Sequence, residues 1–105
     1  MFCVIYRWRI KPELEDQFIE NWAAITRFYI ENRGGWGSRL HRGEDGLFYA
    51  YAQWKSSEAR EKAFENFPDM PERAKMREAI LETLPEIRLE SVEDLLMLPI
   101  RKNKI

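Results

Sequence analysis

The sequence predicts an α+β domain in which one antiparallel sheet carries helices on one face only. Residues 2–10 form an aromatic and β-branched run, and residues 34–59 hold two strand-like runs around a tight turn. Segments with helical spacing of apolar residues follow each of these regions. The resulting order is β, α, β, β, α(α), β, a ferredoxin-like arrangement in which the helices share one side of the sheet.

The first strand is expected over residues 2–10. One face carries Phe2, Val4, Tyr6 and Trp8, and the other carries Cys3, Ile5, Arg7 and Arg9. Both faces are apolar at the start, which predicts a central strand covered on both sides there.

A long helix is expected from Pro12, which suits a first helical position, to about Arg33 before Gly34. Its apolar residues recur at three- and four-residue steps at Leu14, Phe18, Trp22, Ile25 and Tyr29. Such a stripe packs on a sheet. Trp22 and Tyr29 either belong wholly to this core or line a cavity between helix and sheet.

The hairpin at residues 37–54 is expected to turn at Asp45-Gly46 in a type I′ conformation. That turn pairs His41 with Ala50 and Arg39 with Ala52, so two polar side chains lie beside small ones. This face either provides the floor of a pocket or carries edge-strand side chains that lie in water or at a subunit contact.

Two short helices are expected after the hairpin. The first begins at Ser56 or Ser57 and ends before Pro68, and the second is capped by Asp69 and runs to Pro85. A last strand of open starting point follows within residues 86–98 and reaches Leu98. Residues 1–100 then form a single domain, and the basic tail 101–105 is expected to be frayed.

The composition excludes several classes of function. A net charge of −1 gives no electrostatic reason for a nucleic-acid or anionic membrane partner. No apolar run approaches the roughly 20 residues that span a bilayer, and the first residues lack signal-peptide features, so we expect a cytoplasmic protein. The single Cys3 and single His41 provide neither a disulfide nor a metal site.

Aromatic residues are abundant, with four Trp, four Tyr and six Phe in 105 residues. They predict a thick core, a subunit interface or an aromatic-lined cavity. The sheet face without helices also needs cover, and a second copy of the sheet is the simplest cover. We therefore expect a homodimer through this face.

Several motifs together resemble a known family. These are Val4-Ile5-Tyr6-Arg7 before Lys11-Pro12, then Gly35-Trp36-Gly37, Glu44-Asp45-Gly46 and Trp54-Lys55-Ser56-Ser57-Glu58-Ala59. The pattern resembles the antibiotic biosynthesis monooxygenase domain family of the dimeric α/β-barrel superfamily. The resemblance covers nearly the whole chain, and its motifs mark strands, turns and helices rather than reacting groups.

The resemblance implies a cofactor-free monooxygenase of an aromatic, hydroquinone-type small molecule, held between sheet and helices in a dimeric α/β barrel. A pocket of this kind needs apolar walls and one or two groups that bind substrate oxygens. The candidate catalytic residues are His41, whose ordinary pKa is near neutrality, and Arg39. The candidate pocket residues are Ile5, Tyr6, Trp22, Tyr51, Phe64 and Met76.

Relatives of the heme-degrading branch use an Asn, a Trp and a His at positions that fall here near Ile5, Ala63 and Arg73. None of the three matches, so no heme, metal or other cofactor is expected. The alternative function is a non-catalytic homodimer that binds a small molecule or serves as a scaffold, because the sequence contains no nucleophile and base pair, phosphate loop or metal cluster.

Overall fold

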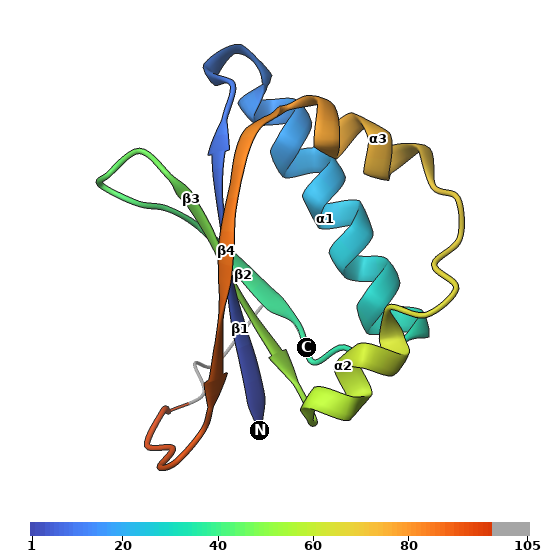
Figure 1. Cartoon of the computed structure of the whole chain (residues 1–105), viewed down its shortest axis with the longest axis vertical. Helices are drawn as coiled ribbons and strands as arrows, with labels where there is room; N and C mark the ends of the chain where they lie inside the picture. Colours follow the sequence, from blue (N-terminus) through green and yellow to red (C-terminus); the bar gives the residue numbers. More distant parts are fainter. Residues whose placement is uncertain (98–105) are drawn as a thin grey trace.

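A computed structural model of the protein describes residues 1–97 (Figure 1). Its elements are β1 (Phe2–Ile10), a 3₁₀ turn η1 (Pro12–Leu14), α1 (Glu15–Asn32), β2 (Ser38–Arg42), β3 (Phe48–Trp54), α2 (Ser57–Ala63), α3 (Pro71–Glu78) and β4 (Ile80–Glu90).

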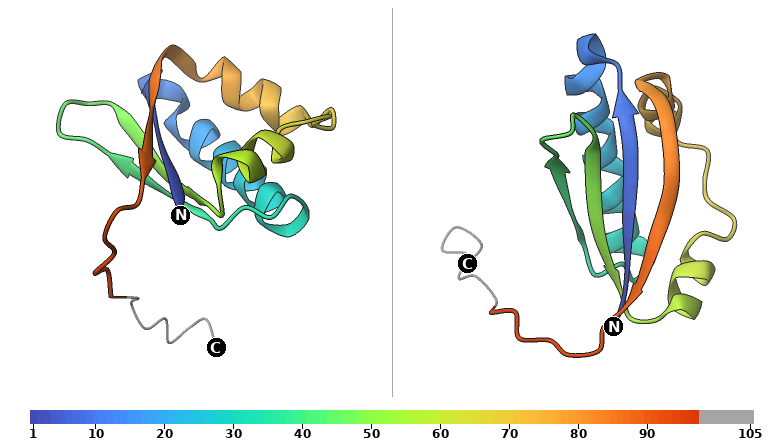
Figure 2. Two further views of the ribbon diagram at one scale, coloured as in Figure 1. Left: turned by 60° about the horizontal axis from the view of Figure 1, so that its bottom comes forward. Right: turned by 60° about the vertical axis from the view of Figure 1, so that its left-hand side comes forward.

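The four strands form one antiparallel sheet in the order β2-β3-β1-β4. All three α-helices lie on the same face of this sheet, and the other face carries no helix (Figures 1 and 2). The predicted α+β, ferredoxin-like fold is confirmed.

The core lies between α1 and the two central strands. Phe18 of α1 is fully buried, and its ring meets Trp8 of β1 and Phe48 of β3 edge-on at centroid distances of 5.1 and 5.6 Å. Edge-to-face contacts of this kind add to the free energy gained by burying the rings. A second cluster joins Val4 and Trp54 to Ala63 of α2. These contacts fix the height of α1 above the sheet.

The predicted register of the β2–β3 hairpin is wrong by one residue. The structure pairs Leu40 with Ala50 and His41 with Tyr49. The turn has three loop residues: Gly43 N–H donates to Leu47 O at 2.8 Å, and Gly46 N–H donates to Gly43 O. Only Gly46 has positive φ there, whereas type I′ also requires positive φ at Asp45. A one-residue slip moves every side chain of β2 to the opposite face.

The helix predicted from Asp69 to Pro85 is wrong at both ends. Its N-cap is Met70, without a side-chain hydrogen bond, and the helix ends at Glu78. Ile80 and Leu84 lie in β4 instead, and the chain passes from helix to strand through one residue. Pro85 is tolerated within β4 because this is an edge strand with a register shift opposite Tyr6. By contrast, the Ser56 cap is confirmed by its bond from Ala59 N–H at 3.1 Å.

The last strand ends at Glu90, so the prediction that it reaches Leu98 is wrong for residues 91–97. These residues leave the sheet as an extended segment (Figure 2). The segment is apolar and exposed at Val92, Leu95, Leu96 and Met97. Leu98 and the tail 101–105 lie outside the described residues.

Replacing Phe18 by Ala tests this account of the core. We expect Phe18→Ala to lower the free energy of unfolding by about 3 to 5 kcal/mol. Phe18 is fully buried, so removal of its ring leaves an empty space inside the core. Ile19→Ala is the control, since Ile19 is 38% exposed, and it should cost less than about 1 kcal/mol. Urea denaturation followed by circular dichroism measures both. Similar losses in the two variants would contradict the assignment of the core.

Candidate functional site

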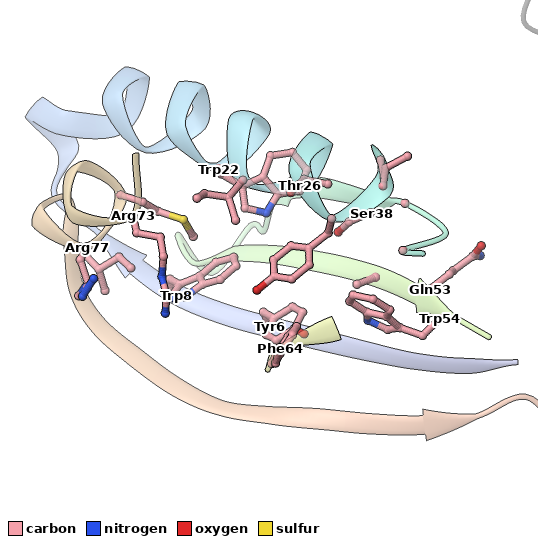
Figure 3. A pocket seen from close by; sticks show the side chains of 18 residues that line it. Tyr6, Trp8, Trp22, Thr26, Ser38, Gln53, Trp54, Phe64, Arg73 and Arg77 are labelled. Atoms are coloured by element: carbon pink, nitrogen blue, oxygen red, sulfur yellow. The ribbon is translucent and has the colours of Figure 1, made fainter. Parts of the chain in front are cut away.

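A cavity of about 470 Å³ lies between the sheet and helices α1 and α3 (Figure 3). Aromatic side chains dominate its wall, which is lined by Tyr6, Trp8, Trp22, Tyr29, Trp54 and Phe64, with Thr26, Ser38, Gln53, Arg73, Met76 and Arg77 among its other residues. The volume suits a small organic ligand, and apolar walls with a few polar groups are typical of such sites.

The space exists because β3 presents small side chains to α1. Ala50 and Ala52 are buried on the helix-facing surface, paired with Tyr6 and Val4 of β1. At the two ends of β3 the helix-facing residues are the larger Phe48 and Trp54, which are also buried. The helix-facing side of β3 therefore carries two small residues between two bulky ones. Ala50 packs in the core with Phe18, and Ala52 lines the cavity.

A buried arginine holds the Tyr6 hydroxyl in the cavity wall. Arg60 of α2 is 8% exposed, and its Nε donates to Tyr6 Oη at 3.1 Å. Its Nη2 donates to Glu86 Oε1 of β4 at 2.8 Å, so the charge is paired. The guanidinium also lies 4.7 Å from the Phe64 ring centroid. Burial of an arginine requires this full set of partners.

Burial raises the pKa of Tyr6 above its ordinary value of 10.0, although Arg60 opposes the shift. Tyr6 is therefore a neutral phenol at physiological pH. Because Arg60 has no acceptor atom, it uses the oxygen of Tyr6 and leaves the hydroxyl proton without a partner among the described residues. Tyr6 can donate that proton to a ligand.

Two further polar atoms are buried without a hydrogen-bond partner in residues 1–97. They are Ser38 Oγ and Trp54 Nε1, and both residues line the cavity. The Trp54 N–H lies close enough to Tyr6 to lower the pKa of Tyr6 slightly, but not in hydrogen-bond geometry. Buried donors without acceptors are costly, and a bound ligand oxygen relieves that cost.

The cavity wall contains no carboxylate among the described residues, whereas two arginines line it. Burial raises the pKa of Tyr29 above 10.0 as well, with Arg73 the strongest opposing charge. The polar groups of the cavity are therefore mainly donors: hydroxyls, an indole N–H and guanidinium groups. Such a lining favours ligands rich in acceptor oxygens, including anionic ones.

Four of the six pocket residues predicted from the sequence line this cavity, namely Tyr6, Trp22, Phe64 and Met76. Ile5 and Tyr51 do not, because they pair with each other on the helix-free face of the sheet. There Tyr51 Oη is 3.1 Å from the buried Cys3 Sγ.

The structure also places Arg39 and His41 away from the cavity, as a result of the register slip. Both are exposed on β2, where they line a second, wider hollow together with Tyr51 and Trp36. Leu96 and Met97 of the C-terminal segment border the same hollow, among other residues.

Sequence reasoning missed the residues that most define the polar side of the cavity. Arg60 and Glu86 are 26 positions apart, on a short helix and an edge strand, and charged residues at such places are usually solvated. Ser38 was missed because the predicted register paired Arg39, and not Ser38, with Ala52. Only the nearby alanines Ala59 and Ala63 indicated that the side of α2 carrying Arg60 is buried.

Residues 1–97 contain no cluster of three or more His, Cys, Asp or Glu side chains able to hold a metal ion. None of the helices in this part of the chain is long and apolar enough to cross a membrane.

The family model described as "Antibiotic biosynthesis monooxygenase" matches residues 1–80. The chain belongs to this family. A comparison of this family member with curated proteins gives no significant match.

Several solved structures share its fold. A putative antibiotic biosynthesis monooxygenase from Bordetella bronchiseptica is 19% identical, with a TM-score of 0.73 over 88% of this chain and 97% of that one. SnoaB from Streptomyces nogalater, described as a cofactor-independent oxygenase, is 16% identical, with a TM-score of 0.72 over 90% and 95%. A putative member from Caulobacter crescentus is 16% identical, with a TM-score of 0.72 over 88% and 90%.

The ion pair of Arg60 and Glu86 makes stability depend on pH. Burial opposes ionisation of Glu86, but hydrogen bonds from Arg60 and Arg88 outweigh it and hold the pKa of Glu86 below its ordinary value of 4.5. The contribution of the ionised Glu86 to the free energy of unfolding is therefore fully present above pH 4.5, and it is lost as the pH falls through the lowered pKa.

We expect Glu86→Gln to cost about 1 to 2 kcal/mol at pH 7, because the carboxylate is partly exposed, and the difference from the wild type should shrink below pH 4.5. Urea unfolding at pH 7, 5, 4 and 3 measures it. Glu82→Gln, whose ion pair with Arg9 is mostly exposed, should cost less than about 0.5 kcal/mol. A cost for Glu86→Gln that is constant across the pH range would contradict the prediction.

Proposed function

We propose that this family member is a cofactor-independent monooxygenase of a phenolic or hydroquinone-type aromatic molecule. The observation that carries the proposal is the aromatic cavity with three donors free for a ligand: the buried Ser38 hydroxyl and Trp54 N–H, which have no partner among the described residues, and the hydroxyl proton of the partly buried Tyr6. Family membership and the fold shared with SnoaB, described as a cofactor-independent oxygenase, support a monooxygenase-like role.

The chemistry assigned to the site is stabilisation of a phenolate. Donors aimed at a phenol oxygen in a water-poor cavity favour the charged form of the ligand and so lower its pKa. The phenolate of a hydroquinone or of an electron-rich polycyclic phenol is able to reduce dioxygen directly. The protein's part is then to bind the rings, orient the oxygen through Tyr6 and exclude water.

The proposed reaction needs no other reductant. Oxidation of a phenol to a quinone provides four electrons, which reduce one O₂ fully. One oxygen atom becomes the new ring carbonyl, and the other leaves as water with the C–H and O–H hydrogens of the substrate.

Oxygen uptake by the purified protein against a panel of hydroquinones and polycyclic phenols tests this function. We expect Tyr6→Phe to lower kcat/KM roughly 100-fold, because it removes one phenolate donor and keeps the ring. Tyr51→Phe, the same change on the opposite face, should leave kcat/KM within about twofold.

The variants His41→Ala and Arg39→Ala are assayed on the same compounds, because these two residues line the second hollow. Loss of turnover in these two variants, with Tyr6→Phe unaffected, would move the reaction to that hollow. Absence of uptake above the spontaneous rate on every compound would leave the alternative function, a non-catalytic homodimer that binds a small molecule or acts as a scaffold.

We further propose a homodimer that closes into an α/β barrel through the helix-free sheet face. That face carries apolar residues on β1 and β4, where Ile87 is 39% exposed and pairs with Ile5, and Leu89 lies on the same side of β4. The exposed apolar segment that includes Leu95 and Leu96 starts at the end of the same sheet. Contiguous apolar surface of this kind favours association.

We expect Ile87→Asp to convert the dimer to a folded monomer, because a charge in the centre of the interface loses its water. Ile30→Asp is the matched control on the helical side, since Ile30 of α1 is 47% exposed and does not border the second hollow. Light scattering after size exclusion reports the mass of each variant. A monomeric wild type, or a dimer in both variants, would contradict this interface.

A further inference from the structure

The two arginines of the cavity wall lie on one face of α3. Arg73 and Arg77 are four residues apart, so their side chains are neighbours on the helix surface. Both line the cavity, and neither forms a salt bridge within 4 Å among the described residues. Four other arginines of these residues, by contrast, do form such ion pairs, and they are Arg9, Arg42, Arg60 and Arg88.

The surroundings explain why these two guanidinium groups stay available. Glu78, which follows Arg77 directly, accepts a hydrogen bond from Gln17 Nε2 at 2.7 Å. Arg73 lies over the ring of Phe67, with 4.5 Å between its Cζ and the ring centroid. A stacked guanidinium keeps its planar edge free for a hydrogen-bonded partner.

The polar groups divide between the two ends of the cavity. Figure 3 shows Arg73 and Arg77 near Trp8 at one end, and Ser38, Gln53 and Trp54 at the other. Tyr6, Trp22, Thr26 and Phe64 lie between them. One end is thus cationic, the other offers neutral donors, and aromatic rings cover the distance between the two ends.

We propose that the molecule bound here is an aromatic carboxylate: its acid group pairs with Arg73 and Arg77, its rings fill the aromatic middle, and its phenolic oxygen faces Tyr6 and the Ser38 and Trp54 end. The inference deepens the proposed function, on which it rests for the role of the cavity, and it names the substrate as an anion. Guanidinium groups bind carboxylates through paired, charge-assisted hydrogen bonds.

The carboxylate contributes to affinity because the cavity offers it no competing charge. The described lining contains no acidic side chain, so no carboxylate of the cavity wall competes with the ligand for the two arginines. An ester of the same acid keeps the size, rings and phenol but loses the charge. Acid and ester therefore form a matched pair that isolates the contribution of the arginines.

Isothermal titration calorimetry under nitrogen with the full chain tests the inference. The probes are 6-hydroxy-2-naphthoate and its methyl ester, whose hydroxyl and acid groups lie at opposite ends of two fused rings that suit a cavity of this volume. We expect the wild type to bind the acid at least about tenfold more tightly than the ester. In the double variant Arg73→Gln with Arg77→Gln, the ratio of the two dissociation constants should fall to near one.

Lys75→Gln is the matched control, because Lys75 lies on the same helix, loses the same charge and does not line the cavity. It should keep the wild-type preference for the acid. If the double variant fails to fold by circular dichroism, Arg77→Gln alone carries the test and should lower the preference at least about threefold. Equal binding of acid and ester by the wild type, or an undiminished preference in the folded arginine variants, would overturn the inference.

Binding and turnover separate this inference from the proposed function. A preference for the acid that depends on Arg73 and Arg77, without oxygen uptake on any phenol, would reject the oxygenase and keep the anion site. Oxygen uptake on neutral hydroquinones, without any preference for the acid, would reject the anion site and keep the oxygenase.

Discussion

The spacing of small and large side chains on the helix-facing side of β3 is the constraint on which the site depends. Phe48 and Ala50 pack in the core with Phe18, while the small Ala52 lines the cavity beside Trp54 and leaves space beneath α1. Interiors are otherwise packed to high density, so a gap of about 470 Å³ in so small a domain requires rigid walls. The contacts of Phe18 with both central strands provide that rigidity.

The buried Arg60 joins the fold to the chemistry of the site. Desolvating a guanidinium is costly, and replacing a buried ion pair by apolar residues often stabilises a protein. Here the pair with Glu86 links α2 to the edge strand β4 and also fixes the oxygen of Tyr6. A packing role alone does not require the hydrogen bond to Tyr6, whereas orientation of a ligand-binding hydroxyl does. We therefore interpret the network as one that holds Tyr6 ready to donate its proton.

The sequence predicted the fold, the family and half of the aromatic wall, because apolar periodicity and turn residues report on local structure directly. The prediction failed at the hairpin, where a register shift of one residue decides on which face of the sheet a side chain lies. A three-residue turn ending at Gly46, in place of a two-residue one, moved Arg39 and His41 out of the candidate site. It failed again at Ile80, since a direct passage from helix to strand leaves no Gly or Pro to mark the boundary. Arg60 was missed because its partners come from distant segments of the chain.

The most direct test of the central claim follows the tryptophan indole N–H signals by NMR as 1-naphthol is added under nitrogen. Trp54 lines the cavity with an unpaired N–H, whereas Trp36, 55% exposed, lines only the second hollow. Trp54→Phe and Trp36→Phe assign the two signals. The account predicts a downfield shift of the Trp54 signal, as its N–H gains an acceptor, and an unmoved Trp36 signal. A shift of Trp36 with Trp54 unchanged would contradict the assignment of the ligand site to the cavity beneath α1.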